Sequence, residues 1–538
     1  MKCFASGKPW LAVILAAGGL ALGSPAIAEE GVHDLTRLGT VEFKVDCTAD
    51  AQEKFNHAMA LYHSFAWGEA GTAFAAIAEA DPACGMAHWG RAMVMLDNPF
   101  VWPANLPPEK LDNVAAALEE ARSAGLRTAR EQGYVAAVEA FVRDRDTLDH
   151  RTRVEAFEEA LGQVAADNAG DTEAAILHAL VTSANFDPAD KTYANQVRAA
   201  EILEPLFQAH PDHPGVAHYL IHTYDYPPLA QQGLEAAKRY AGIAPDAPHA
   251  LHMPSHIFTR VGYWQDSIAT NIGSAKADGS RTYSTHHARD YMVYAYLQLA
   301  QDRAAQTAME QALSSPAVDH FAAAFAYAAM PARLALESGE WAAAANIALQ
   351  PPADAYPWDK YPQAEAINAF ARGIGAARSG DAAAAREREG RLEALRDATK
   401  PAYWIQQIDI QADIVGALAL CADGETQACI EAMTQAAARE DATEKHVVTP
   451  GPILPARELL ADILLEDGKP AEALTEYEAV LAKEPNRYRA VAGAMEAAEK
   501  AGDLKTARAH AAHLLDQAAK TDSERASLQL AQRISGGQ

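Results

Sequence analysis

A spacing of 34 residues recurs along this chain and constrains its fold more than any other feature. Alanine, leucine, glutamate and arginine recur at helical spacing, with almost no alternating β-branched runs, so the repeated unit is helical. In one unit, Ala461 and Ala473 at positions 8 and 20 let two antiparallel helices approach closely, and Pro485 stops the second helix. A fixed helical period of this length predicts hairpins that stack into a solenoid. The period is carried by Leu460, Ala461, Leu464, Ala473, Tyr477, Val480 and Pro485, then by Ala494, Met495, Ala507 and Leu514, and near the N-terminus by Leu61, Ala70, Phe74, Ile77 and Pro82.

These offsets resemble the tetratricopeptide repeat (TPR) family, and the resemblance covers most of residues 50–520. It implies an all-α fold, a TPR-like helical-hairpin solenoid wound as a right-handed superhelix. Its concave groove, lined by the first helix of each hairpin, would hold a peptide or protein segment. We expect residues 29–310 to form an N-terminal TPR-like array with a histidine-rich groove, and residues 311–538 a C-terminal TPR-like array.

The segments 61–65 and 81–90, together with the histidine-containing middle of the chain, are also similar to a group of bacterial exported TPR proteins. This resemblance implies the same fold and an exported protein.

Residues 1–28 have the pattern of a secretory signal peptide. Two lysines precede the apolar run Trp10–Leu22, and the small-x-small motif at 26–28 predicts cleavage before Glu29. No later stretch approaches 18 consecutive apolar residues. We therefore expect a periplasmic or secreted protein with no membrane insertion after cleavage.

Four cysteines follow the predicted cleavage site, and an even number in an exported chain favours disulfides, with three possible pairings. We expect Cys47 to pair with Cys84 and Cys421 with Cys429, because each pair brackets one helical hairpin. Free buried thiols are the alternative.

The charge balance excludes some classes of partner. Lys and Arg number 45 against 72 Asp and Glu, which gives a formal net charge of −27. Sequence-independent binding to nucleic acid and electrostatic docking on anionic lipid both need a surplus of basic residues, so neither is expected.

Histidines gather in the middle of the chain, where nine of the nineteen lie within residues 210–287. Two His-x-x-x-His pairs, His218/His222 and His252/His256, each place both rings on one helix face. The pairs are 34 residues apart, so they occupy equivalent positions of consecutive units.

The TPR resemblance implies that these positions, and those of His249 and Asp225, face the groove. One further period leads from His252 and His256 to His286 and Asp290. The predicted set of metal ligands is therefore His218, His222, His249, His252, His256, His286, Asp225 and Asp290.

This set has more ligands than a single tetrahedral ion can use, so the sequence predicts one or two transition-metal ions. Nitrogen-rich ligation without thiolate favours zinc, copper or iron over calcium or magnesium, with manganese also open.

A metal-free periplasmic scaffold that binds proteins or peptides in the groove is the alternative. A lone histidine in a TPR helix is usually a packed or surface residue, and His210, His213 and His287 are interpreted in this way. Pro254 lies between His252 and His256, and a kink there would spoil the pairing of their rings.

A small-molecule metalloenzyme is the third hypothesis. Tyr219 and Met253 stand where a His-Glu-x-x-His protease carries glutamate, so that machinery is absent. The sequence leaves open whether the chain is an enzyme. The candidate catalytic residues are Asp225 and Asp290 as bases, and Arg260, Tyr224, Tyr226 and Tyr294 as residues that orient a substrate.

Overall fold

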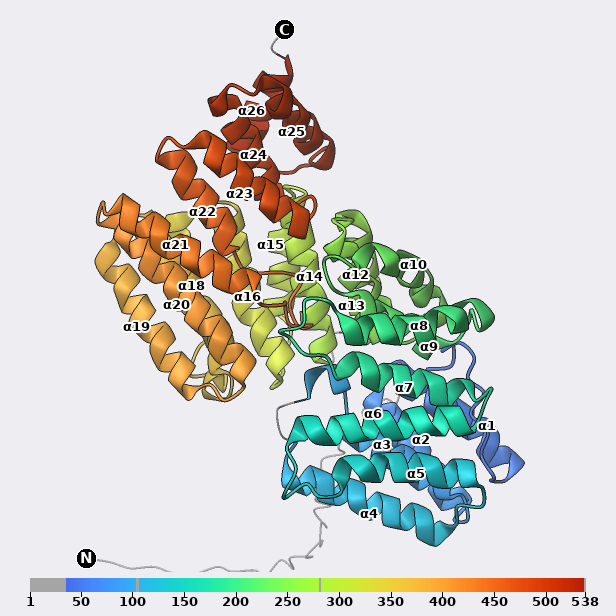
Figure 1. Ribbon diagram of the computed structural model, residues 1–538. Helices are drawn as coiled ribbons and strands as arrows, with labels where there is room; N and C mark the ends of the chain where they lie inside the picture. Colours follow the sequence, from blue (N-terminus) through green and yellow to red (C-terminus); the bar gives the residue numbers. More distant parts are fainter. Residues whose placement is uncertain (1–34, 103–105, 280–281, 537–538) are drawn as a thin grey trace, which may run out of the picture. The chain divides into compact units, whose positions relative to one another are not determined.

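The computed structural model describes residues 35–102, 106–279 and 282–536, so the predicted signal peptide of residues 1–28 lies outside the described residues. Helices follow one another along these ranges, which contain no strand (Figure 1). The fold is therefore all-α, as the 34-residue period predicts.

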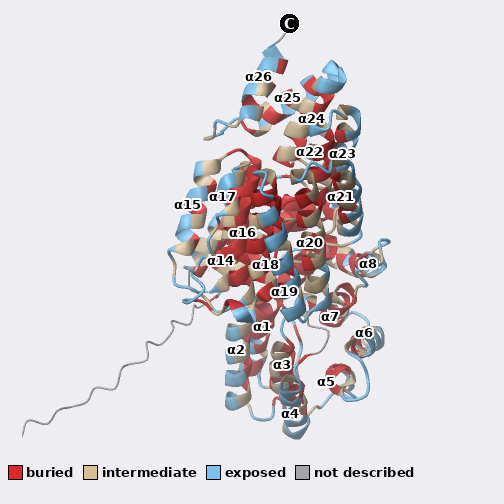
Figure 2. Cartoon of the chain, turned by 90° about the vertical axis from the view of Figure 1, so that its left-hand side faces the viewer, coloured by how far each residue is buried: buried red, intermediate tan, exposed pale blue. Residues whose placement is uncertain are grey.

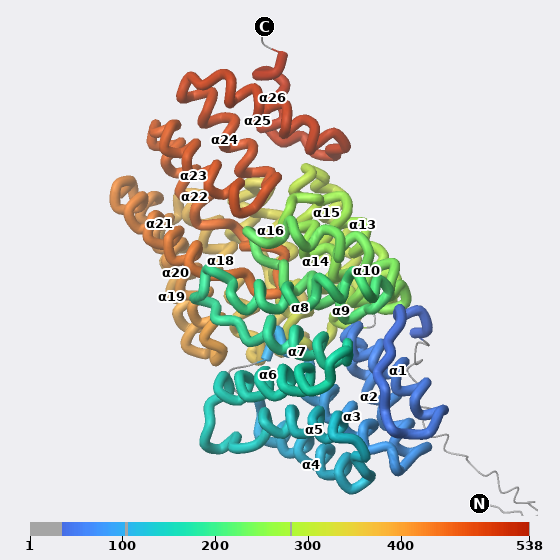
Figure 3. The backbone as a smooth tube through the Cα atoms, turned by 45° about the vertical axis from the view of Figure 1, so that its right-hand side comes forward, coloured from blue at the N-terminus to red at the C-terminus, as the bar shows by residue number. Residues whose placement is uncertain are grey.

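Most helices pair with the next helix in the chain as an antiparallel hairpin, and the trace runs from hairpin to hairpin (Figure 3). The helices are α1 (Ala49–His63), α2 (Trp67–Ala80), α3 (Gly85–Leu96), α4 (Pro108–Ala124), α5 (Ala129–Val142), α6 (His150–Asp167), α7 (Thr172–Ala184), α8 (Ala194–Ala209), α9 (Pro214–Tyr224), α10 (Leu234–Ile243), α11 (Pro248–His252), α12 (Pro254–Arg260), α13 (Trp264–Asp278), α14 (Tyr283–Gln298), α15 (Asp302–Leu313), α16 (Phe321–Glu337), α17 (Trp341–Ala345), α18 (Pro362–Arg378), α19 (Ala382–Ala398), α20 (Ala402–Ala422), α21 (Thr426–Asp441), α22 (Ala456–Glu466), α23 (Pro470–Lys483), α24 (Tyr488–Ala501), α25 (Leu504–Gln517) and α26 (Ala526–Gly536). Short 3₁₀ turns occur at Pro99–Val101, Ala230–Gly233 and Trp358–Lys360.

The hairpin of α22 and α23 illustrates how the repeat folds. Ala461 and Ala473 are fully buried, and these small side chains let the two helices pack closely. Gly468 ends the first helix with a φ of +77°, a conformation that glycine adopts without strain, and Pro470 begins the second. The chain is therefore a TPR-like helical-hairpin solenoid.

The middle of the solenoid is covered by a more distant part of the chain. Helices α14 and α16 are buried along almost their whole length (Figure 2). Helix α24 packs against α14, where the backbone N–H of Tyr488 donates to Gln298 Oε1 at 2.8 Å. In this respect the structure differs from a solenoid in which each hairpin contacts only its neighbours.

The connection between α21 and α22, residues 442–455, also crosses to the middle of the chain, and we call it the strap. Tyr291 Oη on α14 donates to the carbonyl of Thr449 at 3.1 Å, and Arg333 Nη2 on α16 donates to Thr449 Oγ1 at 2.8 Å. The strap thereby lies against the histidine-rich segment.

Both predicted cysteine pairs are joined. Cys47, just before α1, is bonded to Cys84, just before α3, and Cys421 near the end of α20 is bonded to Cys429 in α21.

Among the described residues, α20 alone is long and apolar enough to cross a membrane, by length and composition only. In the structure α20 packs against α18, α19 and α21, as a helix of the solenoid.

Arg487, immediately before α24, is fully buried and joins three other helices. Its guanidinium donates to Glu337 on α16 at 2.7 Å, to Glu458 on α22 at 2.6 Å and to Tyr294 Oη on α14 at 3.1 Å.

Arg487→Met leaves two buried carboxylates without this cation, so we expect a loss of about 3–5 kcal/mol in the free energy of unfolding. Thermal unfolding followed by circular dichroism measures it. Arg533→Met removes an exposed ion pair and serves as the control, and equal losses in both variants would contradict the assigned role of Arg487.

Candidate metal centre

Six histidines from four helices come together in the middle of the solenoid. They form two groups of three, and within each group one ring nitrogen of every histidine lies within 4.8 Å of the others. The first group is His218 and His222 on α9 with His249 on α11, and the second is His252 on α11, His256 on α12 and His287 on α14.

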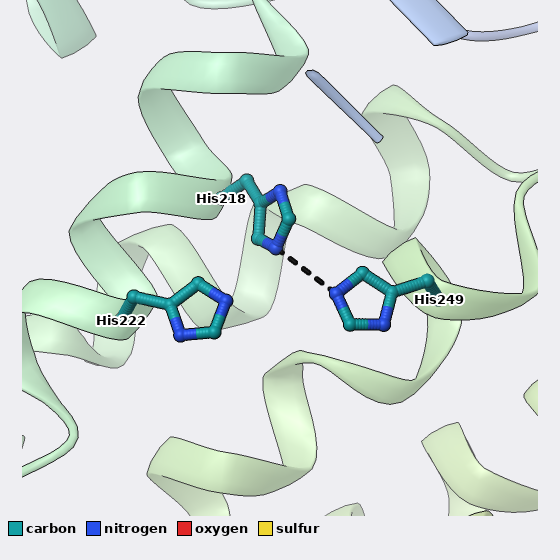
Figure 4. A group of neighbouring side chains, drawn as sticks. All are labelled: His218, His222 and His249. Atoms are coloured by element: carbon teal, nitrogen blue, oxygen red, sulfur yellow. Dashed lines mark hydrogen bonds between the residues drawn. The ribbon is translucent and has the colours of Figure 1, made fainter. Parts of the chain in front are cut away.

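In the first group, the rings turn a nitrogen of each side chain toward a common point (Figure 4). His218 Nε2 lies 3.1 Å from His249 Nε2, and His218 Nδ1 is 2.7 Å from the carbonyl oxygen of His63, to which it donates. His222 is 5% exposed, and among the described residues neither of its ring nitrogens has a hydrogen-bond partner. Its ring is stacked on Phe100, with 4.0 Å between centroids.

In the second group, His252 Nε2 lies 3.0 Å from His256 Nε2. His252 Nδ1 donates to Asn271 Oδ1 at 2.6 Å, and this amide is oriented because its Nδ2 donates to the carbonyl of Ser267 at 2.7 Å. His256 Nδ1 donates to Asp225 Oδ2 at 2.9 Å. Both rings therefore carry their proton on Nδ1, and their facing Nε2 atoms both present a lone pair.

Pro254 does interrupt the helix between these two histidines, as its position in the sequence suggests. Helix α11 ends at His252 and α12 begins at Pro254. The break does not separate the rings, whose Nε2 atoms still meet.

The two groups adjoin each other. Ring centroids are 6.1 Å apart for His222 and His256, and 6.3 Å apart for His249 and His252. Two ions held by the two groups would therefore be neighbours.

All six imidazoles are neutral at physiological pH. Burial lowers the pKa of each ring, and the neighbouring histidines lower it further, which brings the pKa of His252 to about 3. Burial also lowers the pKa of His256, against the effect of Asp225. Neutral imidazole is the form that binds metal ions.

Asp225 does not point at either group as a free ligand. Its carboxylate accepts from His256, from Arg260 Nε at 2.8 Å and from Lys445 Nζ of the strap at 2.8 Å. Burial raises the pKa of Asp225, but Lys445 and Arg260 outweigh it and hold that pKa well below its usual range. Asp225 and Arg260, two of the candidate catalytic residues, thus orient His256 and hold the strap.

The structure places both residues predicted for the third unit away from the two histidine groups. His286 lies apart from the groups, where its Nε2 is 3.0 Å from Tyr327 Oη, and Asp290 is buried against Arg333 at 3.0 Å. The neighbour His287, interpreted from sequence as a packed or surface residue, belongs to the second group.

The reason is a change of spacing. Helices α9 and α11 begin 34 residues apart, at Pro214 and Pro248, whereas α14 begins 35 residues after α11, at Tyr283. The fourth residue after each helix start is then a group member: His218, His252 and His287. Helix α14 begins after Thr282 without the proline that opens α9 and α11, so the sequence carries no such mark for this change of spacing.

A third set of neighbouring ligand atoms, His63, Glu173 and His213, lies behind the first group. Glu173 accepts from His63 Nε2 at 2.9 Å and from His213 Nε2 at 2.8 Å, and His63 Nδ1 is 2.9 Å from Tyr219 Oη. A Cβ at position 215 would lie 2.5 Å from His63 Nδ1, so only glycine at that position lets His63 approach α9. These hydrogen bonds position His63, and the backbone carbonyl of His63 orients His218.

His213 therefore has a defined role that the sequence did not indicate, whereas His210 is exposed.

A cavity of about 310 Å³ opens beside the first group. His222, Asp225 and Tyr226 lie on one wall, and strap residues including Lys445 and His446 lie on another. Of the tyrosines suggested as orienting residues, Tyr226 lines this cavity.

Comparisons with known proteins address the fold alone. No protein-family model matches the chain, and no curated protein matches it. Solved structures that match include the APC/C hetero-tetramer Cut9–Hcn1, with 13% identity and a TM-score of 0.38, covering 90% of this chain and 78% of that one. The TPR domain of P58(IPK) has 11% identity and a TM-score of 0.24, covering 85% and 99%, and Naa15/Naa10 bound to HypK-THB has 10% identity and a TM-score of 0.25, covering 90% and 73%.

Glu173→Gln tests the set behind the first group. Burial raises the pKa of Glu173, but His213 and His63 lower it by more than burial raises it. The pKa of Glu173 is therefore lower in the folded protein than in the unfolded chain. This carboxylate therefore stabilises the fold above its unfolded pKa of about 4.3, and the stabilisation is lost as the pH falls through the folded value. We expect the variant to lose about 1–3 kcal/mol at pH 7, because one imidazole N–H then faces an amide N–H.

Thermal unfolding at pH 7 and at lower pH measures this difference, which should narrow below about pH 4. Glu53→Gln, on the exposed face of α1, is the matched control. A pH-independent difference would contradict an ionised Glu173.

Proposed function

We propose that this chain is an exported TPR-like protein that holds transition-metal ions at the six-histidine centre, one ion in each group of three. The proposal is supported above all by the 3.0 Å contact between His252 Nε2 and His256 Nε2.

That contact has no proton to share. Asn271 and Asp225 accept the Nδ1 protons of the two rings, and the low pKa values of both imidazoles oppose a second proton. Two facing lone pairs repel each other, whereas a cation between them is bound by both. Two Zn–N bonds of about 2.0–2.1 Å at a tetrahedral angle place their nitrogens roughly 3.3 Å apart, close to the separation here.

The donor set favours zinc, copper or iron, because all six ligands are imidazoles. Three protein ligands for each ion leave a coordination position for water or substrate, which is the arrangement of catalytic zinc sites. The Nδ1 N–H groups of His218, His252 and His256 each donate to a protein oxygen. Metal-ligating histidines usually make such outer-shell hydrogen bonds.

The alternative, a metal-free scaffold that binds a peptide at the histidine segment, is less well supported. The strap already lies against that face, through Lys445 on Asp225 and Thr449 on Tyr291. Other parts of the TPR-like solenoid remain candidates for a protein partner.

Export, to the periplasm or as a secreted protein, is part of the proposal. The signal-peptide pattern of residues 1–28 and the two disulfides support it, because disulfides persist in oxidising compartments.

Elemental analysis of the protein purified without a histidine tag tests the metal proposal. We expect about two transition-metal ions per chain, and His252→Ala combined with His256→Ala should remove about one of them. His57→Ala changes an exposed histidine on α1 and should leave the metal content unchanged. Substoichiometric metal that the double variant does not alter would contradict the proposal.

Asn271→Leu tests the outer shell. Without the amide oxygen that accepts from His252 Nδ1, the ring loses its fixed tautomer, and we expect metal affinity to fall about 10–100-fold. Competition with a chromophoric chelator measures the affinity. Asn113→Leu, on the exposed face of α4, is the control, and an affinity loss shared by both variants would argue against a role for Asn271.

A further inference from the structure

The cavity beside the first group has the features of a ligand site. Its volume of about 310 Å³ suits a small molecule, and His222 connects it to the metal centre. The walls come from distant parts of the chain: the loops around Phe100 and Phe186, helix α20 with Tyr403, and the strap.

Aromatic rings make up much of the wall. Phe100, Phe186, Tyr226 and Tyr403 all line the cavity, together with the imidazole of His446. Flat walls of this kind favour a planar, aromatic occupant, because ring contacts add to the burial of apolar area.

The polar lining of the cavity contains both acceptors and donors. Glu444 Oε1 accepts from Lys191 Nζ at 2.9 Å and from Tyr193 Oη at 2.8 Å, whereas Glu444 Oε2 has no partner among the described residues. Asp187 is the other carboxylate besides Asp225, and it is exposed.

The donors lie on His222, His446 and Lys445. When one nitrogen of His222 binds an ion, the other carries the proton, and no described residue accepts it. His446 Nδ1 accepts from the backbone N–H of Val448 at 3.1 Å, which leaves the proton of this ring on Nε2. Among the described residues, Lys445 Nζ bonds to Asp225 only, with one of its three donors.

Beside the proposed ion, the charge favours an anion, since Glu444 is paired with Lys191. Three neutral imidazoles leave the full charge of a bound cation uncompensated, and Asp225 is already neutralised by Lys445 and Arg260. An anionic oxygen would complete the coordination of the ion and accept from the donors of the wall.

Resting on the proposed function, we infer that this cavity binds a small aromatic molecule carrying an oxyanion, a carboxylate or phenolate, whose oxygen approaches the ion held by His218, His222 and His249. The aromatic ring lies among Phe100, Phe186 and Tyr403, and Lys445 offsets the negative charge.

Calorimetric titration of the metal-loaded protein with salicylate tests this inference. We expect saturable binding that weakens at least tenfold after a chelator removes the metal. Cyclohexanecarboxylate has the same charge without the aromatic ring, and it should bind at least tenfold more weakly.

Ala189→Trp fills the exposed rim of the cavity without touching the histidines, so it should weaken salicylate binding at least tenfold while metal content is retained. Ala169→Trp, at an exposed turn after α6, is the control for the bulky substitution. Lys445→Met should also weaken binding, with metal content measured in the same sample.

Fully metal-loaded protein that does not bind salicylate, or that binds it equally well with Trp at 189, would overturn the inference and leave the metal proposal standing. Equal affinity for cyclohexanecarboxylate would exclude the aromatic specificity. Purified protein that takes up no metal at either group would instead contradict the metal proposal itself, and the inference with it.

Discussion

The carboxylate of Asp225 connects the second group of histidines to the strap. It follows the last residue of α9, accepts the proton of His256 on α12, and binds Lys445 from a strap 220 residues further along the chain. Arg260 completes its partners and also donates to its backbone carbonyl at 2.8 Å. One buried anion with two cations and a neutral donor is stable where an unpaired charge is not, so losing any partner would loosen both the strap and the orientation of a ring.

The histidine cluster imposes a second constraint on the fold. The neutral imidazoles of His252 and His256 turn their Nε2 lone pairs toward each other, and a cation between them would remove that repulsion. An ion that binds the folded chain but not the unfolded one stabilises the fold by about 4 kcal/mol at a thousand times its dissociation constant. Metal occupancy and the packing of α9, α11, α12 and α14 are therefore expected to depend on each other.

The repeat period made the fold and five of the six clustered histidines predictable. His218, His222, His252 and His256 followed from the 34-residue spacing, and His249 from the groove position that the TPR resemblance implies. The spacing alone could not locate His287, because one extra residue before α14 shifts the register by one position.

Partners that the period does not govern were not predictable. Lys445 reaches Asp225 from the strap, a connection between repeats that lies 220 residues further along the chain. Asn271 lies on a second helix, where a single amide gives no pattern in the sequence.

The same register explains why the centre has six histidines and not more. The fourth and eighth residues after the helix start are His218 and His222 on α9, and His252 and His256 across α11 and α12. On α14 the eighth residue is Tyr291, whose hydroxyl donates to the strap, and on α7 the two positions are Ile176 and Leu180, both buried. The histidine pattern therefore stops at buried apolar residues on α7 and at a tyrosine that binds the strap on α14. With His249 one turn earlier on α11, these positions supply two groups of three imidazoles, and the cavity lies beside the first group, with His222 in its lining.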